Sequence, residues 1–292
     1  MFRLAVIALL WALSTYSTSG EVSASMIERQ GQKGADALVF IPGLASHGDL
    51  WRPWAEKFAS SQNVYVVTAS GFAGEPANIV DKPFLETIVV EIAARLEKDG
   101  VRRATVVGHS IGGLMALMLA NDVPDIVGNV LVVDSLPYLA AMFMPSATPD
   151  QAQAQANLMA DQMKSMPHDL FTAQQKQGLR RLSNTLAFLP VLEKWSAASD
   201  QRTVAKAFAE GLGTDYRPAL KSIAAHVTVL AAYSEAMRVP RTHIETLYEA
   251  QYAGLQHANI QLVDDSFHFI MIDQPEQFSR HLSSVLNQGE TR

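Results

Sequence analysis

A serine lies at the centre of a short motif that could supply a nucleophile. Residues 108–112 read Gly-His-Ser-Ile-Gly, with Ser110 in the middle. The apolar, β-branched run 105–107 precedes the motif and the helix-forming stretch 114–120 follows it, so the predicted order is strand, tight turn, helix. Glycines on both sides of the turn allow a strained serine backbone without collisions against the adjoining strand and helix. The pattern predicts an exposed serine hydroxyl, with the backbone N–H of Ile111 directed at the oxyanion that attack on a carbonyl creates.

Strand-like and helix-like segments alternate along most of the chain. Short runs rich in Val, Ile and Leu predict buried strands, and apolar residues at helical spacing predict amphipathic helices. The predicted strands are 35–41, 63–68, 105–107, 129–133, 226–231 and 259–263, and the predicted helices include 49–60, 84–98, 242–252 and 276–286. Near-continuous apolar strands that alternate with helices are typical of an α/β fold with a mostly parallel sheet covered on both faces.

The alternation stops after residue 137. The segment 138–217 shows no convincing strand, and helical patterns fill 150–166, 171–189 and 191–212, where we expect three or four helices. We therefore expect an α/β core formed by 25–137 and 218–292, split by a helical insertion at 138–217.

The first residues have the pattern of an export signal. A positive start at 1–3 is followed by the apolar run 4–13 and a small, polar segment at 14–20, and Ala24 offers a cleavage site. The apolar run is too short to span a bilayer. We therefore expect a secretory signal peptide at 1–24 and a periplasmic or secreted mature protein.

The composition excludes several functional classes. The 292 residues include no cysteine, which rules out disulfides and thiol catalysis. A net charge of −6 without any long basic run argues against nucleic acid as a partner. After signal cleavage, no apolar run is long enough for a membrane span. Metal-binding and phosphate-binding spacings are not found, so we expect no metal and no organic cofactor. The oligomeric state stays open.

Four segments, in their order and spacing, resemble the α/β-hydrolase superfamily. They are 40–44 (Phe-Ile-Pro-Gly-Leu), Trp51, the motif at 108–112 and the segment 267–278. The resemblance covers roughly 35–136 and 222–288. It implies the α/β-hydrolase fold, with the insertion at 138–217 forming a helical cap over the site. It also implies a catalytic triad in the order serine, acid, histidine, with the motif as the nucleophile elbow of a serine hydrolase.

The resemblance assigns roles to single residues. Ser110 becomes the nucleophile, and it needs a base because its hydroxyl is inert at neutral pH. Of the eight histidines, His268 alone follows the last predicted strand and precedes the last predicted helix, where the family places its base. The oxyanion donors are the backbone N–H groups of Ile111 and of Leu44, with Ala45 as second choice for the latter.

The acid of the triad has two main candidates. Asp134 ends the strand that follows the elbow helix, a place that the acid occupies in some members of the family. Glu235 is the nearby carboxylate in the segment after the penultimate strand, where the family usually places its acid. We favour Asp134, because a carboxylate that ends a buried strand is in position to orient a histidine. Asp264 and Asp265, close in sequence to His268, are further alternatives, as is a site without an acid.

The first half of the insertion is apolar and rich in methionine. Met142, Phe143 and Met159 are candidates to line the substrate pocket, and Trp51 could add an aromatic wall. The alternative is that these residues pack the cap onto the core. Methionine adapts to irregular apolar ligands, which favours an apolar acyl or alcohol part. No cluster of arginines stands out in the sequence, so a strongly anionic substrate is not expected.

The leading expectation is a serine esterase that cleaves a small-molecule carboxylic ester through an acyl-enzyme on Ser110. Hydrolysis of an amide, lactone, thioester or C–C bond uses the same arrangement and stays open. A catalytically weak relative that only binds an apolar ligand is the alternative from another functional class.

Overall fold

The computed structural model describes residues 23, 25–32, 34, 36–78, 82–256 and 258–288. The predicted signal peptide, 1–24, lies outside the described residues except for Ser23. No helix among the described residues is both long enough and apolar enough to cross a membrane.

A central sheet organises the described chain. Its strands are β1 (Ser25–Gly31), β2 (Ala37–Ile41), β3 (Asn63–Ala69), β4 (Ala104–His109), β5 (Val127–Val133), β6 (His226–Ala232) and β7 (Ala258–Val263). They are arranged in the order β1-β3-β2-β4-β5-β6-β7. Every neighbouring pair is parallel except β1 with β3, which is antiparallel. The mostly parallel sheet is therefore confirmed, and the carboxyl ends of β2 to β7 meet at one edge.

Strand β1 was not predicted, and its composition explains why. It reads Ser-Met-Ile-Glu-Arg-Gln-Gly, with only its first residue buried. As an edge strand, β1 pairs along one side only, from Ser25 opposite Ala69 to Gly31 opposite Asn63. Such a strand needs no continuous apolar run, so the pattern that reveals buried parallel strands is missing.

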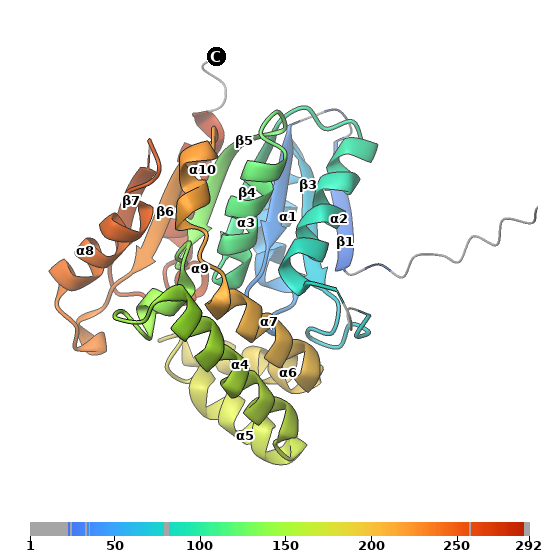
Figure 1. Cartoon of the computed structure of the whole chain (residues 1–292). Coiled ribbons are helices and arrows are strands. Elements are labelled where there is room, and N and C mark those ends of the chain that lie inside the picture. Colours follow the sequence, from blue (N-terminus) through green and yellow to red (C-terminus); the bar gives the residue numbers. More distant parts are fainter. Residues whose placement is uncertain are drawn as a thin grey trace, which may run out of the picture.

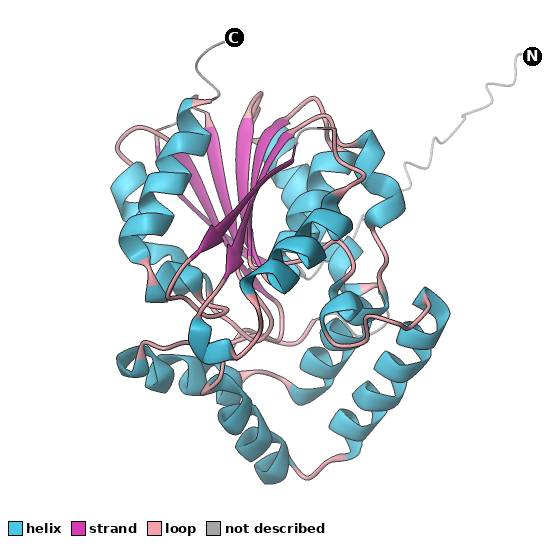
Figure 2. Ribbon diagram, turned by 90° about the vertical axis from the view of Figure 1, so that its left-hand side faces the viewer, coloured by secondary structure: helices cyan, strands magenta, loops and turns pink. Residues whose placement is uncertain are grey.

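Helices cover both faces of the sheet (Figures 1 and 2). The core helices are α1 (Arg52–Phe58), α2 (Phe84–Lys98), α3 (Ile111–Asp122), α8 (Arg241–Tyr252), α9 (Ile270–Asp273) and α10 (Pro275–Asn287). Buried side chains of α2, α3 and α8 share one apolar cluster, and those of α1 and α10 share another. Helix α2 has the predicted bounds, because its apolar residues recur at helical spacing on one buried face.

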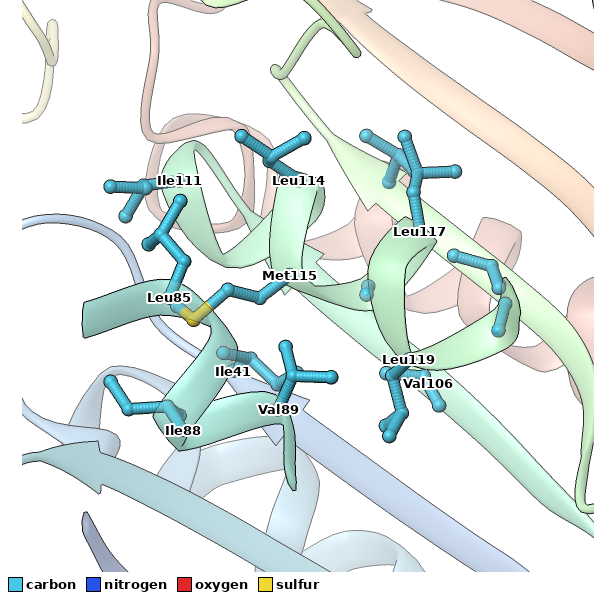
Figure 3. Close-up of a cluster of buried hydrophobic side chains, with 14 of the residues drawn as sticks. Ile41, Leu85, Ile88, Val89, Val106, Ile111, Leu114, Met115, Leu117 and Leu119 are labelled. Carbon is cyan, nitrogen blue, oxygen red and sulfur yellow. The ribbon is translucent and has the colours of Figure 1, made fainter. Parts of the chain in front are cut away.

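The packing between α2 and α3 covers the end of β2, where Ile41 pairs with Gly108 of β4. Leu85 and Met115 meet between the two helices, and Ile41 lies beneath them (Figure 3). All three side chains are at most 2% exposed. Full burial of an apolar side chain of this size contributes roughly 1.5–3 kcal/mol. The turn between β4 and α3 therefore rests on a tightly packed support.

The chain between β5 and β6 is helical throughout its regular elements. These are η2 (Leu139–Met142), α4 (Pro149–Ser165), α5 (His168–Leu179), η3 (Leu186–Phe188), α6 (Leu189–Ala198), α7 (Gln201–Gly213) and η4 (Arg217–Ser222). Helices α4 to α7 lie together at the lower end of Figure 1, and we call residues 138–217 the cap. The helical pattern predicted for 171–189 is interrupted, because α5 ends at Leu179 and a loop, 180–185, follows.

The cap is joined to the core by specific contacts. In α7, the Glu210 carboxylate accepts hydrogen bonds from the backbone N–H groups of Phe84 (2.6 Å) and Leu85 (3.0 Å) at the start of α2. A carboxylate there satisfies donors that the helix leaves free and interacts favourably with the positive end of its dipole.

Candidate active site

Ser110 occupies the tight turn between β4 and α3. Its backbone has φ 54° and ψ −126°, a conformation that a non-glycine residue rarely adopts. The Ser110 N–H donates to the Val133 carbonyl (3.0 Å), and the Ser110 carbonyl accepts from Gly113 N–H (2.8 Å). A Cβ at Gly108 would lie 2.1 Å from the Gly112 carbonyl oxygen, and a Cβ at Gly112 would lie 2.4 Å from the Ile41 carbonyl oxygen. The two glycines are therefore required by close backbone approach.

Two backbone N–H groups are available beside this serine. Leu44 and Ile111 line the same cavity as Ser110. Across the described ranges, no hydrogen-bond acceptor is found for the backbone N–H of either residue. The geometry thus leaves both donors free for a negatively charged oxygen in the cavity.

His268, after β7, and Asp134, after β5, are brought together at the carboxyl edge of the sheet. His268 Nδ1 donates to Asp134 Oδ2 over 2.7 Å. The other oxygen, Oδ1, accepts from the backbone N–H of Ala232 (2.9 Å) and from the hydroxyl of Tyr248 (2.8 Å). Both carboxylate oxygens are therefore satisfied, and His268 is held in the tautomer with a proton on Nδ1 whenever it is neutral.

The environment keeps Asp134 ionised. Burial by itself would raise the pKa of this carboxyl, but the hydrogen bond and charge of His268, with the donors Ala232 and Tyr248, hold it below its ordinary value. Burial and the neighbouring carboxylate raise the pKa of Tyr248 well above its ordinary value, so its hydroxyl stays a donor. Sequence reasoning missed Tyr248, because a tyrosine on a helix carries no signal of what it will contact across the fold.

The other candidate acids lie elsewhere. Glu235 is exposed in η5 (Glu235–Met237), and no hydrogen bond joins it to His268. Asp264 pairs with Arg241 at the surface. Asp265 is exposed, with φ 55°, and its carbonyl accepts from Asn184 and Gln274. Among the acids considered from the sequence, the structure brings only Asp134 to the histidine.

His109 contacts the backbone of the His268 loop. Its Nε2 lies 3.0 Å from the His268 carbonyl oxygen, and the two imidazole rings are 4.4 Å apart between centroids. Burial, followed by the proximity of His268, holds the pKa of His109 well below its ordinary value. His109 is therefore neutral and donates through Nε2, while its buried Nδ1 has no hydrogen-bond partner. The hydrogen bond of His109 therefore reaches out of the elbow to the His268 loop.

A cavity of about 800 Å³ opens onto Ser110 and His268. Met142 and Phe143 of the cap are among its lining residues, as expected. Met159 is not among them. Trp51 is not at the cavity either: its side chain is fully buried, stacked on Phe40 with ring centroids 5.2 Å apart. The aromatic-wall expectation for Trp51 is wrong because the indole fills the core between the sheet and α10.

The lining also includes a pair of arginines, which were not anticipated from the sequence. Arg180 and Arg181, which follow α5, are both lining residues. As two adjacent residues in a polar segment they do not stand out in the sequence, and only the folding of the cap brings them to the cavity. Among the described residues, no cluster of three or more histidine and acidic side chains is arranged to hold a metal ion.

Known proteins resemble the chain in both sequence and structure. Over 109 residues it is 35% identical to the pimeloyl-(acyl-carrier protein) methyl ester esterase of Aliivibrio salmonicida, a match that covers 37% of this chain and 39% of that protein. Over 279 residues it is 23% identical to a RutD protein of Pantoea ananatis, covering 87% of this chain and 94% of the relative. The chain spans about two fifths of the length of the first curated relatives that it matches.

The structural likeness extends over almost the whole fold. The solved structure of MenH from S. aureus superposes with a TM-score of 0.73 at 18% identity, covering 92% of this chain and 100% of that chain. A likeness at this identity concerns the fold alone. The profile described as the Alpha/beta hydrolase family matches residues 38–281, which is most of the chain. The chain therefore belongs to the α/β hydrolase family.

Proposed function

We propose that this protein is a serine esterase that hydrolyses a small-molecule carboxylic ester through an acyl-enzyme on Ser110. The observation that carries the proposal is the 2.7 Å contact between His268 Nδ1 and Asp134 Oδ2, beside the cavity that Ser110 also lines. The buried carboxylate holds the proton on Nδ1 of the imidazole. The other nitrogen, Nε2, is then free to accept a proton from the serine hydroxyl.

The first half of the reaction acylates the serine. Ser110 Oγ attacks the ester carbonyl carbon, and His268 Nε2 takes the hydroxyl proton. The carbonyl oxygen becomes negatively charged and receives hydrogen bonds from the backbone N–H groups of Leu44 and Ile111. The tetrahedral intermediate then collapses, the bond to the alcohol oxygen breaks, and His268 returns its proton to the leaving alcohol.

The second half releases the acid. Water enters at the acyl carbon, His268 takes one of its protons, and the same two N–H groups stabilise the second oxyanion. Collapse breaks the bond to Ser110 Oγ, which recovers its proton from His268. Asp134 stays ionised throughout and stabilises the imidazolium that forms twice per turnover.

The cavity supports an ester with an apolar part. Met142, Phe143, Leu139 and Phe208 contribute apolar lining from the cap. The relative from Aliivibrio salmonicida is named as a methyl ester esterase, which favours an ester as the reacting group. The RutD relative is provisionally named a carbamate hydrolase, so carbamates belong in the substrate screen with lactones and thioesters.

The test is hydrolysis of 4-nitrophenyl acetate, butyrate and octanoate by the purified protein, with Ser110→Ala and His268→Ala as variants. We expect turnover by the wild type and a loss of roughly a thousandfold or more in either variant, with the thermal unfolding profile retained. A fluorophosphonate should label the wild type at Ser110 and leave Ser110→Ala unlabelled. Full activity of Ser110→Ala would overturn the proposal. If the wild type shows no turnover and no labelling, the proposal also fails, and a ligand-binding role becomes the remaining explanation.

We also propose that residues 1–24 direct export to the periplasm or the medium and are then removed. Strand β1 begins at Ser25, so cleavage after Ala24 would leave the pairing of the sheet intact. N-terminal sequencing of the protein recovered from a bacterial periplasmic fraction tests this. A mature chain that starts at Ser25 is the expected result, and retention of Met1 in the cytoplasm would contradict it.

A further inference from the structure

Two arginines at the rim of the cavity have no acidic partner. Arg180 and Arg181 are exposed and both line the cavity, and within the described part of the chain neither guanidinium group forms a hydrogen bond or an ion pair. The described lining residues include one carboxylate, Asp134, which already accepts from His268, Ala232 and Tyr248. The cavity therefore has two uncompensated positive charges on the cap side.

The loop that carries these arginines is anchored to the loop that carries His268. The Asp273 carboxylate accepts from Ser183 Oγ (2.6 Å), from Asn184 N–H (3.1 Å) and from Thr185 Oγ1 (2.9 Å). The same carboxylate accepts from Phe267 N–H (2.9 Å), next to His268.

A backbone contact adds to this anchor. The Leu182 carbonyl accepts from Phe269 N–H over 3.0 Å. The residues directly before and after His268 are thus both tied to the loop at 180–185 or to its anchor. The backbone that presents the two arginines is therefore fixed relative to the base, although the guanidinium groups themselves reach into solvent.

The surroundings of the arginines set the shape of a matching ligand. Leu179 and Leu182, on either side of the pair in sequence, also line the cavity, as do Met142 and Phe143 of the cap. A guanidinium group binds carboxylate and phosphate oxygens through paired N–H donors, and apolar walls exclude a ligand that is charged along its whole length. The arrangement fits a molecule with an apolar middle and one anionic end.

From this we infer that the substrate is an anionic amphiphile: an ester whose apolar segment fills the cavity and whose far end carries a carboxylate or phosphate group bound by Arg180 and Arg181. The inference rests on the proposed esterase function and names its substrate class. The scissile ester lies at Ser110, and the anionic group lies at the end of the molecule remote from it.

The first experiment compares matched substrates. The 4-nitrophenyl monoester of adipic acid has a free carboxylate, its methyl-capped form is neutral at nearly the same length, and 4-nitrophenyl 6-phosphonohexanoate carries the phosphate-like group. We expect kcat/KM for one or both charged esters to exceed that of the neutral ester by about tenfold, the scale of one or two hydrogen bonds to charged groups. The advantage should shrink as salt is raised from about 0.05 to about 0.5 M, because exposed charges are screened.

The second experiment removes the charges. The double variant Arg180→Gln/Arg181→Gln should lose the preference for charged esters and keep the rate on the neutral one. Arg102→Gln is the matched control, because Arg102 is an exposed arginine that does not line the cavity. Equal rates on charged and neutral esters in the wild type would overturn the inference while leaving the esterase proposal intact, and so would an equal loss on both esters in the double variant.

A binding measurement separates the two proposals if no ester is turned over. Titration of Ser110→Ala with the adipate monoester and with its capped form should show tighter binding of the charged compound, again by about tenfold. If that preference is lost when Arg180→Gln and Arg181→Gln are added to Ser110→Ala, the result supports the anion site even though no ester is hydrolysed. Equal binding of the two compounds would contradict it.

Discussion

The carboxyl edge of the sheet and the cap position their functional groups in different ways. At the edge, backbone contacts decide: Ser110 is held between β4 and α3, where a Cβ at Gly108 would lie 2.1 Å from a carbonyl oxygen. In the cap, the loop that carries Arg180 and Arg181 is anchored mainly by a side chain of the core, the carboxylate of Asp273. The serine turn at the edge has almost no room for an added side chain, whereas Arg180 and Arg181 of the cap are exposed. We therefore propose that the reacting groups belong to the edge and that the cap selects the substrate.

The largest expected effect tests whether the edge alone provides the acid. Asp134→Asn should lower kcat by about ten-thousandfold, because the amide favours the wrong tautomer of His268 and gives no charge to stabilise the imidazolium. Glu235→Gln makes the same acid-to-amide change at an exposed residue, and it should leave kcat within about twofold of the wild-type value. Steady-state kinetics on 4-nitrophenyl butyrate measures both. A collapse in Glu235→Gln with an active Asp134→Asn would reverse the assignment.

The second prediction compares how well the two regions tolerate the same glycine-to-alanine substitution. Gly108→Ala should destabilise the protein by about 3 kcal/mol or more, because the new Cβ has no space beside the backbone of Gly112. Gly178→Ala in cap helix α5 should be neutral or stabilise by up to about 1 kcal/mol, since nothing lies within 4 Å of the added Cβ. Urea unfolding gives both values, and similar losses at the two sites would remove the contrast.

The third prediction concerns the pH dependence of stability. The pKa of buried His109 lies well below its ordinary value, so in the pH range between the two values the unfolded chain binds a proton that the folded chain does not. Stability is then fully present above about pH 6.5, the unfolded value, and falls as the pH drops below it, by up to about 1.4 kcal/mol per pH unit.

Unfolding free energies at about pH 7.5 and about pH 5.5 measure this slope. His109→Gln should flatten it, whereas His168→Gln, a change at an exposed histidine of the cap, should leave it as in the wild type. An unchanged slope in His109→Gln would show that the buried imidazole is not its source.

The smallest effect concerns the donors around Asp134. Tyr248→Phe should lower kcat by roughly threefold to tenfold, because one hydrogen bond to the carboxylate is lost while Ala232 and His268 still hold it. Tyr252→Phe is the control, since its hydroxyl donates to the Ser135 carbonyl and not to the carboxylate. The acid limb of the pH–rate profile gives a readout that a purely structural loss would not move. Equal effects of the two variants would indicate a packing role for Tyr248.

Much of the fold follows from local pattern. Helix α2 has its predicted bounds because its apolar face repeats at helical spacing, and strands β2 to β6 read as apolar runs because helices cover both sides of them. The elbow can be recognised in the sequence because its glycines are required by close backbone contacts. These contacts lie within a few residues of Ser110 and with one neighbouring strand. The edge strand β1 was missed since one-sided pairing leaves no such pattern.

The sequence by itself determined the α/β fold, the turn at Ser110 and the segment that carries His268, because each depends on neighbours along the chain. Only the tertiary structure decided that Asp134, and not Glu235, meets His268, since either could follow a strand at the same edge. It also decided that Trp51 fills the core and that Arg180 and Arg181 reach the cavity. These outcomes depend on how the cap and helices fold back on the sheet, which brings together residues far apart in sequence.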